Sequence, residues 1–300
     1  MAARHSSRSA ATSRARTRRA AGCGTAAAVS LLVVLGTIVG GVVWLRMNEY
    51  IAPTPFEPRC RLVAAGNTTV LDLGQARQAT VIVGRALDRG LPARAGSIAM
   101  ATAYQESGVR NLDYGDRDSL GLFQQRPSQG WGTPEQIMDP YYSTDVFYDA
   151  LLKVDGWEDG DINDVAQAVQ RSGFPEAYRK HEPNARIVAS VLAGYSPGGL
   201  TCGYTTPAAA DPAALADSLQ RSLGADADVS ADGATLSVRA ADEQQAWAVA
   251  HHAVAQAARD GVVSVAVAGQ RWEWAPRTLP EWTAADTGDP LTVTVWFLTP

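Results

Sequence analysis

The chain has 300 residues, of which 46% are hydrophobic and 19% charged, a composition typical of a globular protein with about two domains. No Asp or Glu precedes Glu49, and seven arginines lie before it. Residues 49–300 therefore carry a formal charge of −12, from 19 basic and 31 acidic side chains. Because phosphate contacts need Lys and Arg, this acidic body argues against nucleic acid as a partner.

The Ala20–Leu45 segment contains no charged residue, and about 20 apolar residues suffice to cross a bilayer as a helix. We therefore expect a basic cytoplasmic tail over residues 1–25 and one transmembrane helix over residues 26–46. Arginines cluster before the apolar run, which predicts a cytoplasmic N-terminus and an extracytoplasmic body in a single-pass protein of the cell membrane. A cleaved signal peptide is the alternative, but the run is long for one and no small-x-small cleavage site follows it.

A proline-rich spacer over residues 47–59 follows the predicted signal anchor. Apolar residues then recur with helical spacing in five segments, and a Gly- and Asp-rich stretch over residues 109–135 predicts loops. The expected helices are residues 75–89, residues 95–107, a segment beginning near Asp139, residues 162–172 and residues 185–193. Residues 60–202 should thus form a mainly α domain.

Between Tyr195 and Asp211 the composition shifts to Gly, Pro, Thr and Ala, which predicts a linker over residues 203–211. Two helical patterns follow, together with segments of alternating or β-branched residues. The expected helices are residues 212–223 and 242–259, and the expected strands are residues 235–239, 262–267, 270–274 and 291–297. Residues 212–300 should form a small α+β domain, with helices on one face of an antiparallel sheet.

Two of the three cysteines, Cys60 and Cys202, fall outside the predicted membrane segment. Two cysteines in an oxidising compartment predict a disulfide bond. This bond would clamp the two ends of residues 60–202, with a chain-entropy contribution of about 4–5 kcal/mol. Two independent thiols are the alternative, and Cys23, at the cytoplasmic edge of the apolar segment, is expected to be a free thiol.

Glu106 is the first candidate for chemistry. Ile98, Thr102 and Glu106 are spaced by four, which puts this carboxylate on the buried face of the predicted helix. Burial disfavours the anion and raises the pKa of a carboxyl group, as a general acid for glycoside cleavage requires. The alternative is a glutamate near a helix end that is solvated or bonded to the backbone.

Glu106-Ser107, followed by the segment Gly121-Leu122-Phe123-Gln124, resembles the signature of the soluble lytic transglycosylase and goose-type lysozyme superfamily. The resemblance covers roughly residues 75–195. It implies a lysozyme-like fold for residues 60–202 that acts on peptidoglycan, with Glu106 as the catalytic acid and base. It also places Ser107 and Gln124 among the residues that bind the glycan.

The chain departs from this family in two places. Phe123 replaces the usual Met, and the family's Ala-Tyr-Asn-Ala-Gly segment has no clean match. The nearest counterpart is residues 167–173, in which Gln170 stands where Asn is expected and becomes a candidate for substrate binding. Tyr178, a few residues later, is a candidate for supplying the missing hydroxyl.

Asp116 and Asp118 are candidates for positioning water, since many glycosidases use a second carboxylate. The alternative is that the segment Asp113-Tyr114-Gly115-Asp116 is simply a turn, with Arg117 as its local partner. Among the aromatic residues that follow, most are expected in the core, and Trp131 is the best candidate for stacking on a sugar.

These observations predict a membrane-anchored, extracytoplasmic glycosidase. It would cleave the β-1,4 bond between N-acetylmuramic acid and N-acetylglucosamine, in the manner of a lytic transglycosylase, without a metal or organic cofactor. Its partners would be peptidoglycan strands and, through residues 26–46, the cytoplasmic membrane. The alternative is a non-catalytic glycan-binding or wall-assembly protein with a degenerate lysozyme-like domain, and the C-terminal domain carries no readable motif.

Overall fold

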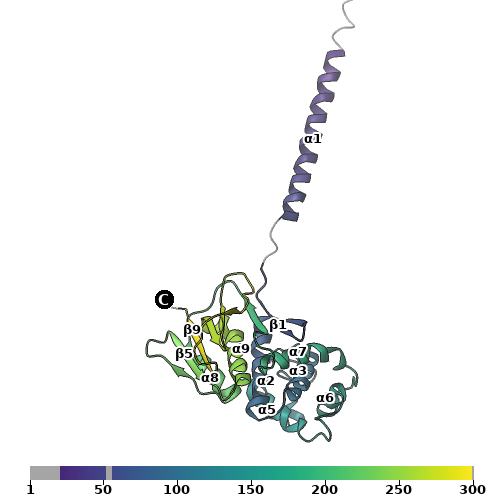
Figure 1. Ribbon diagram of the computed structural model, residues 1–300. Helices are drawn as coiled ribbons and strands as arrows, with labels where there is room; N and C mark the ends of the chain where they lie inside the picture. The colour runs from purple at the N-terminus through teal and green to yellow at the C-terminus, as the bar shows by residue number, and fades with distance from the viewer. Residues whose placement is uncertain (1–20, 52–55, 299–300) are drawn as a thin grey trace, which may run out of the picture. The chain divides into compact units, whose positions relative to one another are not determined.

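The computed structural model describes residues 21–51 and 56–298 (Figure 1). Most of the predicted basic tail, residues 1–25, lies outside these residues, as does part of the predicted spacer, residues 47–59. A helix of 31 residues, α1, runs from Ala21 to Ile51 and includes the predicted membrane segment. Within the described residues, no helix is both long enough and apolar enough to span a membrane. The anchor stays a prediction from the sequence.

The described chain from Phe56 onward forms one compact unit, in which all five helices predicted before residue 202 are present. Its central helix is α3, whose residues 95–103 are all buried and which contacts α2, α5, α6 and α7. These helices are α2 (Leu73–Asp88), α3 (Ala93–Ser107), α5 (Pro140–Leu151), α6 (Ile162–Gln170) and α7 (Glu182–Leu192), with a short α4 (Pro134–Met138).

A three-stranded antiparallel sheet borders these helices, in the order β2-β1-β3. Its strands are β1 (Arg59–Ala64), β2 (Asn67–Leu71) and β3 (Leu200–Gly203), and the sequence patterns did not predict them. Cys60 and Cys202 lie opposite each other on β1 and β3 and form the predicted disulfide bond. Both cysteines are buried, so the bond joins the two ends of the helical part inside the core.

The C-terminal part contains a six-stranded antiparallel sheet in the order β4-β5-β9-β6-β7-β8, so the protein combines α-helices with antiparallel β-sheets. The strands are β4 (Asp228–Val229), β5 (Thr235–Arg239), β6 (Val262–Val267), β7 (Gln270–Glu273), β8 (Thr283–Ala284) and β9 (Thr292–Phe297); the helices are α8 (Pro212–Leu223) and α9 (Glu243–Asp260). The predicted linker, residues 203–211, connects β3 to α8 within the same compact unit.

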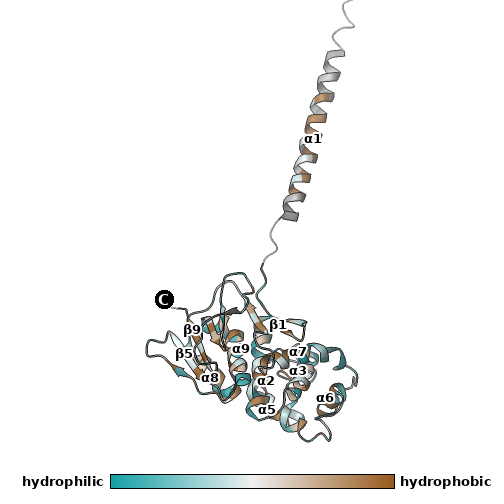
Figure 2. Cartoon of the chain, in the orientation of Figure 1, coloured by the Kyte–Doolittle hydropathy of each residue, from teal (hydrophilic) through white to brown (hydrophobic). Residues whose placement is uncertain are grey.

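Helix α9 joins the two parts of the compact unit. It contacts β6 and β9 of the sheet and also α2 and α7 of the helical part, and its side chains are buried almost throughout. Figure 2 shows hydrophobic residues gathered on such interior elements, with hydrophilic residues along the periphery. The helical part and the sheet therefore share one hydrophobic core through α9.

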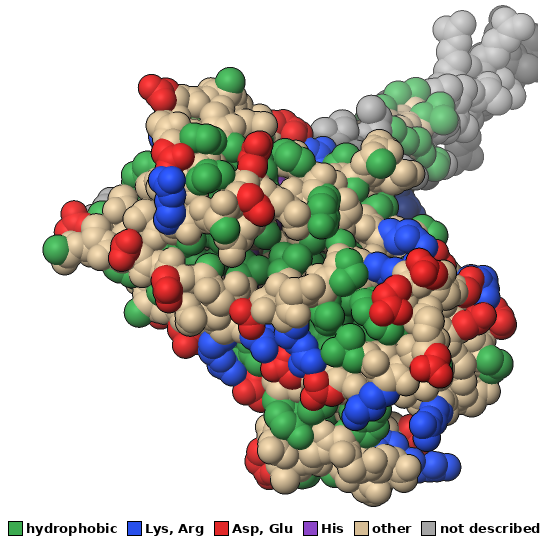
Figure 3. All heavy atoms as spheres, turned by 60° about the horizontal axis from the view of Figure 1, so that its bottom comes forward, with side chains coloured by type: hydrophobic (Ala, Val, Ile, Leu, Met, Phe, Trp, Pro, Cys, Tyr) green, Lys and Arg blue, Asp and Glu red, His purple; other side chains and the backbone are tan. Residues whose placement is uncertain are grey.

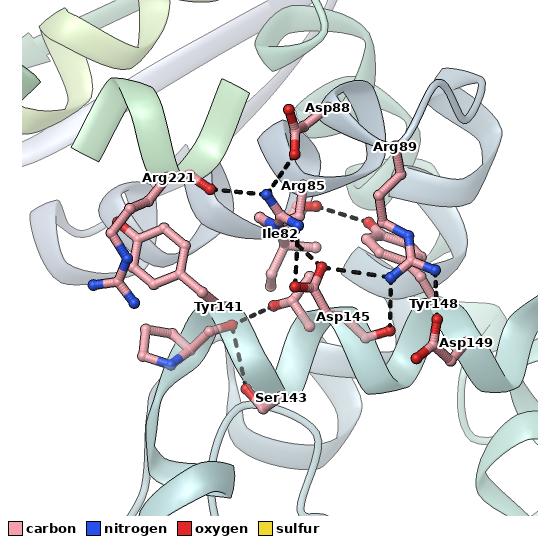
Figure 4. Close-up of polar contacts among 12 residues, drawn as sticks. Ile82, Arg85, Asp88, Arg89, Tyr141, Ser143, Asp145, Tyr148, Asp149 and Arg221 are labelled. Atoms are coloured by element: carbon pink, nitrogen blue, oxygen red, sulfur yellow. Dashed lines mark hydrogen bonds and ion pairs between the residues drawn. The ribbon is translucent and has the colours of Figure 1, made fainter. Parts of the chain in front are cut away.

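Polar contacts join the helices α2, α5 and α8 to one another (Figure 4). Arg85 of α2 donates from Nε and Nη2 to the two carboxylate oxygens of Asp145 on α5, at 2.9 and 3.0 Å. Its Nη1 also donates to the carbonyl oxygen of Arg221 on α8, at 3.0 Å. Because a bidentate pair fixes orientation as well as distance, this arginine sets α2, α5 and α8 in one arrangement.

Helix α9 carries two adjacent histidines whose side chains are buried in the core. His251 donates from Nδ1 to the carbonyl oxygen of Val191 at 2.7 Å, and His252 Nε2 lies 2.8 Å from the hydroxyl oxygen of Ser218. Burial lowers the pKa of His251 to about 4 and that of His252 to about 3, from an ordinary value of 6.5. Both imidazoles are therefore neutral in the folded protein at neutral pH.

The buried histidines predict a loss of stability in mild acid. Below pH 6.5 the unfolded chain binds protons at His251 and His252 that the folded protein does not bind. The free energy of unfolding therefore decreases as the pH is lowered, by up to about 1.4 kcal/mol per pH unit for each histidine. The stabilisation is complete above pH 6.5 and is lost toward the folded pKa values. Urea unfolding between about pH 7.5 and about pH 5 measures this. A His251→Gln/His252→Gln variant should show a shallower dependence, and an equal one would contradict the assignment.

Removing the disulfide should destabilise the compact unit without changing its fold. The bond closes a loop with a sequence separation of 142 residues, and its loss frees the unfolded chain. We expect Cys60→Ala/Cys202→Ala to lower the free energy of unfolding by about 2–4 kcal/mol in denaturant titrations. Cys23→Ser is the control, since it removes a thiol and leaves this bond in place; an equal loss in the control would contradict the prediction.

Candidate active site

Glu106 lies in the last turn of α3, at the point where the central helix reaches the surface. The helix ends at Gly108, which has a left-handed backbone (φ 62°) that glycine adopts without a steric penalty. Gln75, in the first turn of α2, donates to the carbonyl oxygen of Gly108 at 2.8 Å. The end of α3 is thus held by a neighbouring helix, which fixes the position of the Glu106 backbone.

Ser107 connects the end of α3 to the glutamine-containing segment. Its hydroxyl donates to the carbonyl oxygens of Ala103 and Leu122, at 3.1 and 2.7 Å, and accepts from the backbone N–H of Arg110. The structure therefore places this serine as a brace between two elements, and it is not among the side chains that line the cleft described below.

Gln124 is presented to solvent by a segment that is otherwise anchored in the core. Leu122 and Phe123 are completely buried, and the Phe123 ring stacks on Phe147 with centroids 4.5 Å apart. Gln124 itself has a left-handed backbone (φ 47°), a conformation that costs free energy in a residue other than glycine. The anchored neighbours supply the support that such a conformation needs.

A cleft of about 760 Å³ opens beside Glu106. One part of its lining comes from residues 116–131, including Asp116, Gln124 and Trp131. The other part comes from the ends of α5 and α6, including Lys153 and Gln170. Five residues predicted from the sequence therefore meet here, because Glu106 also lines this cleft.

Tyr178 lies against Glu106 and donates a hydrogen bond from its hydroxyl to Oε1 at 2.6 Å. This tyrosine is completely buried. Its segment is held by Asn163 of α6, whose side chain donates to the carbonyl oxygen of Pro175 and accepts from the backbone N–H of Arg179. Residues 167–173 lack the tyrosine that the family carries there, and the hydroxyl that contacts Glu106 comes instead from Tyr178, in a later segment.

The surroundings favour the protonated form of Glu106. Burial raises its pKa above the ordinary value, and the hydrogen bonds from Tyr178 and Gln170 oppose that effect in part. The pKa of Tyr178 is raised too, chiefly by burial and then by its bond to Glu106, so the tyrosine stays a neutral donor. Gln170 also donates to the carbonyl oxygen of Phe123 at 2.8 Å, which ties α6 to the glutamine segment.

The two candidate aspartates differ in their surroundings. Asp118 accepts from Arg126 Nε at 2.7 Å and from the backbone N–H of Ser128 at 2.9 Å, and its contacts with Ser128 and then Arg126 lower its pKa. It therefore braces the loop, with Arg126 as its partner. Asp116 lines the cleft, but its side chain is 92% exposed, with Arg117 Nε at 3.9 Å.

Two basic residues of the cleft, Lys153 and Arg171, were not singled out from the sequence. Both are exposed, and neither side chain makes an ion pair or hydrogen bond within the described part of the chain. Figure 3 shows acidic and basic side chains intermixed over one face of the molecule. No local motif marks these two residues, since only the packing of α5 against α6 brings them to the cleft.

Residues 21–51 and 56–298 contain no group of three or more His, Cys, Asp or Glu side chains arranged to hold a metal ion. The chain matches no protein-family model, and no curated protein matches it significantly.

The Tyr178 hydroxyl should lower the pKa of Glu106. In Tyr178→Phe the acid stays buried but loses one donor to its charged form, so its pKa should rise above that of the parent protein. Carboxyl carbon chemical shifts followed by NMR through a pH titration measure it. Tyr195→Phe, which alters an exposed tyrosine, is the control and should leave the titration of Glu106 unchanged. An unchanged or lowered pKa in Tyr178→Phe would contradict the assignment.

Proposed function

We propose that the protein is a peptidoglycan glycosidase of the lytic transglycosylase type, with Glu106 as its acid and base. The substrate bond is the β-1,4 linkage from N-acetylmuramic acid to N-acetylglucosamine. The observation that carries the proposal is the placement of Glu106, with a raised pKa and a hydrogen bond from Tyr178, beside an open cleft of about 760 Å³. A single protonated carboxyl group in such a cleft suits the protonation of a glycosidic oxygen.

In the proposed reaction, Glu106 donates its proton to the bridging oxygen as the bond from that oxygen to the muramic acid C1 breaks. An oxocarbenium-like state develops on the muramic acid ring. The Glu106 carboxylate then accepts the proton of the C6 hydroxyl while O6 forms a bond to C1. The products are a 1,6-anhydro end and a new free hydroxyl on the neighbouring sugar, and Glu106 regains its proton.

Within the described residues, the cleft lining holds no second carboxylate that is partly buried like Glu106, which favours this route over hydrolysis. Hydrolytic glycosidases ordinarily use two carboxyl groups that flank the bond. Asp118 is engaged by Arg126 and Ser128, and Asp116 is almost fully exposed. Neither has the partly buried setting of Glu106, so the proposed mechanism assigns both proton transfers to that one residue.

Residues in and around the cleft support the acid and the glycan. Tyr178 orients the carboxyl group, while Ser107 fixes the glutamine segment to the end of α3. Gln124, Gln170 and Trp131 line the cleft, and an amide and an indole ring suit the polar edge and the flat face of an aminosugar.

The unpaired side chains of Lys153 and Arg171 suit a substrate that carries carboxylates, as muramic acid and its peptides do. Without such a ligand, the two positive charges would have no negatively charged partner in the cleft, although the protein as a whole is acidic.

We further propose that the body lies outside the cytoplasmic membrane and that residues 26–46 anchor it there. The support is the uncharged Ala20–Leu45 run with arginines before it, together with the Cys60–Cys202 disulfide bond. Disulfides persist in oxidising compartments and are rare in the cytosol.

Glu106→Gln tests the proposed function. It keeps the size of the side chain and removes the transferable proton, so cleavage of purified peptidoglycan should fall by a factor of about 10²–10⁴ or more. The fold should survive, because a neutral amide replaces a half-buried acid. Mass spectrometry of the released fragments should show anhydro ends with the parent protein.

The matched control is Glu135→Gln, which alters a glutamate in the first turn of α4 outside the cleft lining. It should leave cleavage unchanged. Near-normal cleavage by Glu106→Gln would refute the role of this residue. Glycan binding by the parent protein without released fragments would favour a non-catalytic binding protein, and reducing ends in place of anhydro ends would indicate hydrolysis.

A further inference from the structure

A separate pocket of about 500 Å³ lies where α2 and the end of α9 meet the segment that follows β3. Its lining includes Arg77 of α2, Arg259 of α9 and the hydroxyl-bearing residues Tyr204, Thr205 and Thr206. It shares no lining residue with the Glu106 cleft. The pocket is therefore a site distinct from the cleft.

Arg77 is the unusual member of this lining. It is half-buried, and its guanidinium makes no hydrogen bond or ion pair with any residue in the described ranges. Burial lowers the pKa of Arg77 and the positive charge of Arg259 lowers it further, while the negative charges of Asp260 and Asp72 raise it in part. A partly desolvated cation beside a second cation is unfavourable unless an anion compensates it.

The carboxylates around the pocket are engaged elsewhere. Asp260 is almost fully buried and binds Arg259, with Oδ1 at 2.5 Å from Nε and Oδ2 at 2.9 Å from Nη2. Asp72 accepts from the backbone of α2 as its N-terminal cap and pairs with an arginine of the loop after α3. Asp211 accepts from the backbone of α8 in the same way. Arg77 therefore makes no direct ion pair within residues 21–51 and 56–298, although Asp260 and Asp72 attract it at longer range.

The rim of the pocket is held by backbone hydrogen bonds. The N–H of Ala208 donates to the carbonyl oxygen of Ala258 at 2.9 Å, and the carbonyl oxygen of Tyr204 accepts from the N–H of Arg277 at 3.0 Å. Thr205 and Thr206 lie between these two tethers with exposed side chains. The pocket thus exists before any ligand arrives, which lowers the entropic cost of binding.

We propose that this pocket binds a phosphate group, held between Arg77 and Arg259 with the hydroxyls of Thr205 and Thr206 as further donors. Several donors that converge from different elements suit a tetrahedral oxyanion, whose oxygens can each accept hydrogen bonds. A carboxylate has only two oxygens, and the carboxylate of Asp260 already occupies one side of Arg259. The phosphate can be a free ion, a monoester or the diester of a lipid headgroup, because all three present the same oxygens. The proposal does not depend on the activity of the Glu106 cleft.

Thermal unfolding and calorimetry of the full-length protein with inorganic phosphate test the proposal, at constant ionic strength set with chloride. We expect phosphate to raise the unfolding temperature of the parent protein. Arg77→Gln should weaken phosphate binding by on the order of tenfold or more. Without phosphate, Arg77→Gln should be no less stable than the parent, because it removes an uncompensated charge.

The matched control is Arg186→Gln, which removes one exposed positive charge that pairs with Glu182 on α7. It should respond to phosphate as the parent does. Arg259→Gln is unsuitable, since it would leave the buried Asp260 unpaired. Equal responses of the parent and Arg77→Gln, or no response in either, would overturn the proposal.

Two further probes distinguish the sources of the phosphate group. Glycerol 3-phosphate presents a monoester, and a short-chain phosphatidylglycerol below its micelle concentration presents the diester of a lipid headgroup. Binding of phosphate and the monoester alone assigns the site to soluble phosphates. Binding of the diester as well, again lost in Arg77→Gln, assigns it to a lipid headgroup.

Discussion

The half-buried carboxyl group of Glu106 is the constraint to which the rest of the structure is fitted. A carboxyl group with a raised pKa must be partly withdrawn from water, and in the proposed function a substrate must still reach it. The structure combines burial with access by ending its central helix, α3, beside an open cleft. Tyr178 then supplies a donor that orients the carboxyl group, and burial outweighs the effect of that donor on the pKa.

The C-terminal sheet contributes to this arrangement although it lies outside the cleft. Helix α9 packs on the sheet and on α2 and α7, and these two helices contact α3. The neutral histidines of α9 bond to the carbonyl oxygen of Val191 on α7 and to Ser218 on α8. The sheet therefore supports the helical part. Changes in its packing would shift α3 as well, because closely packed cores transmit strain.

The parts that could be predicted are those encoded by local periodicity. The helices were expected from apolar spacing, the buried face of Glu106 from the i, i+4 pattern, and the disulfide from the number of cysteines outside the apolar run. Strands β1 and β3 were missed because they are short and pair residues far apart in the chain. The contact between Tyr178 and Glu106 could not be derived from local pattern, since it depends on Asn163 holding the segment around Tyr178. The ion pair of Asp116 with its sequence neighbour Arg117 was expected from the turn, whereas the pairing of Asp118 with Arg126 depends on how the loop folds.

Unpaired cations were the features least open to prediction, because pairing is decided by tertiary structure. Residues 49–300 carry a formal charge of −12, so the protein repels anionic polymers at long range. Salt screens that repulsion beyond about 8–10 Å, and contacts within that distance then decide what binds. Lys153 and Arg171 in the cleft, and Arg77 in its separate pocket, are attractive at that short range. Under both proposals, an anionic ligand would bind this acidic protein only where its groups enter those hollows, so these cations would set the position of the ligand and contribute to its affinity.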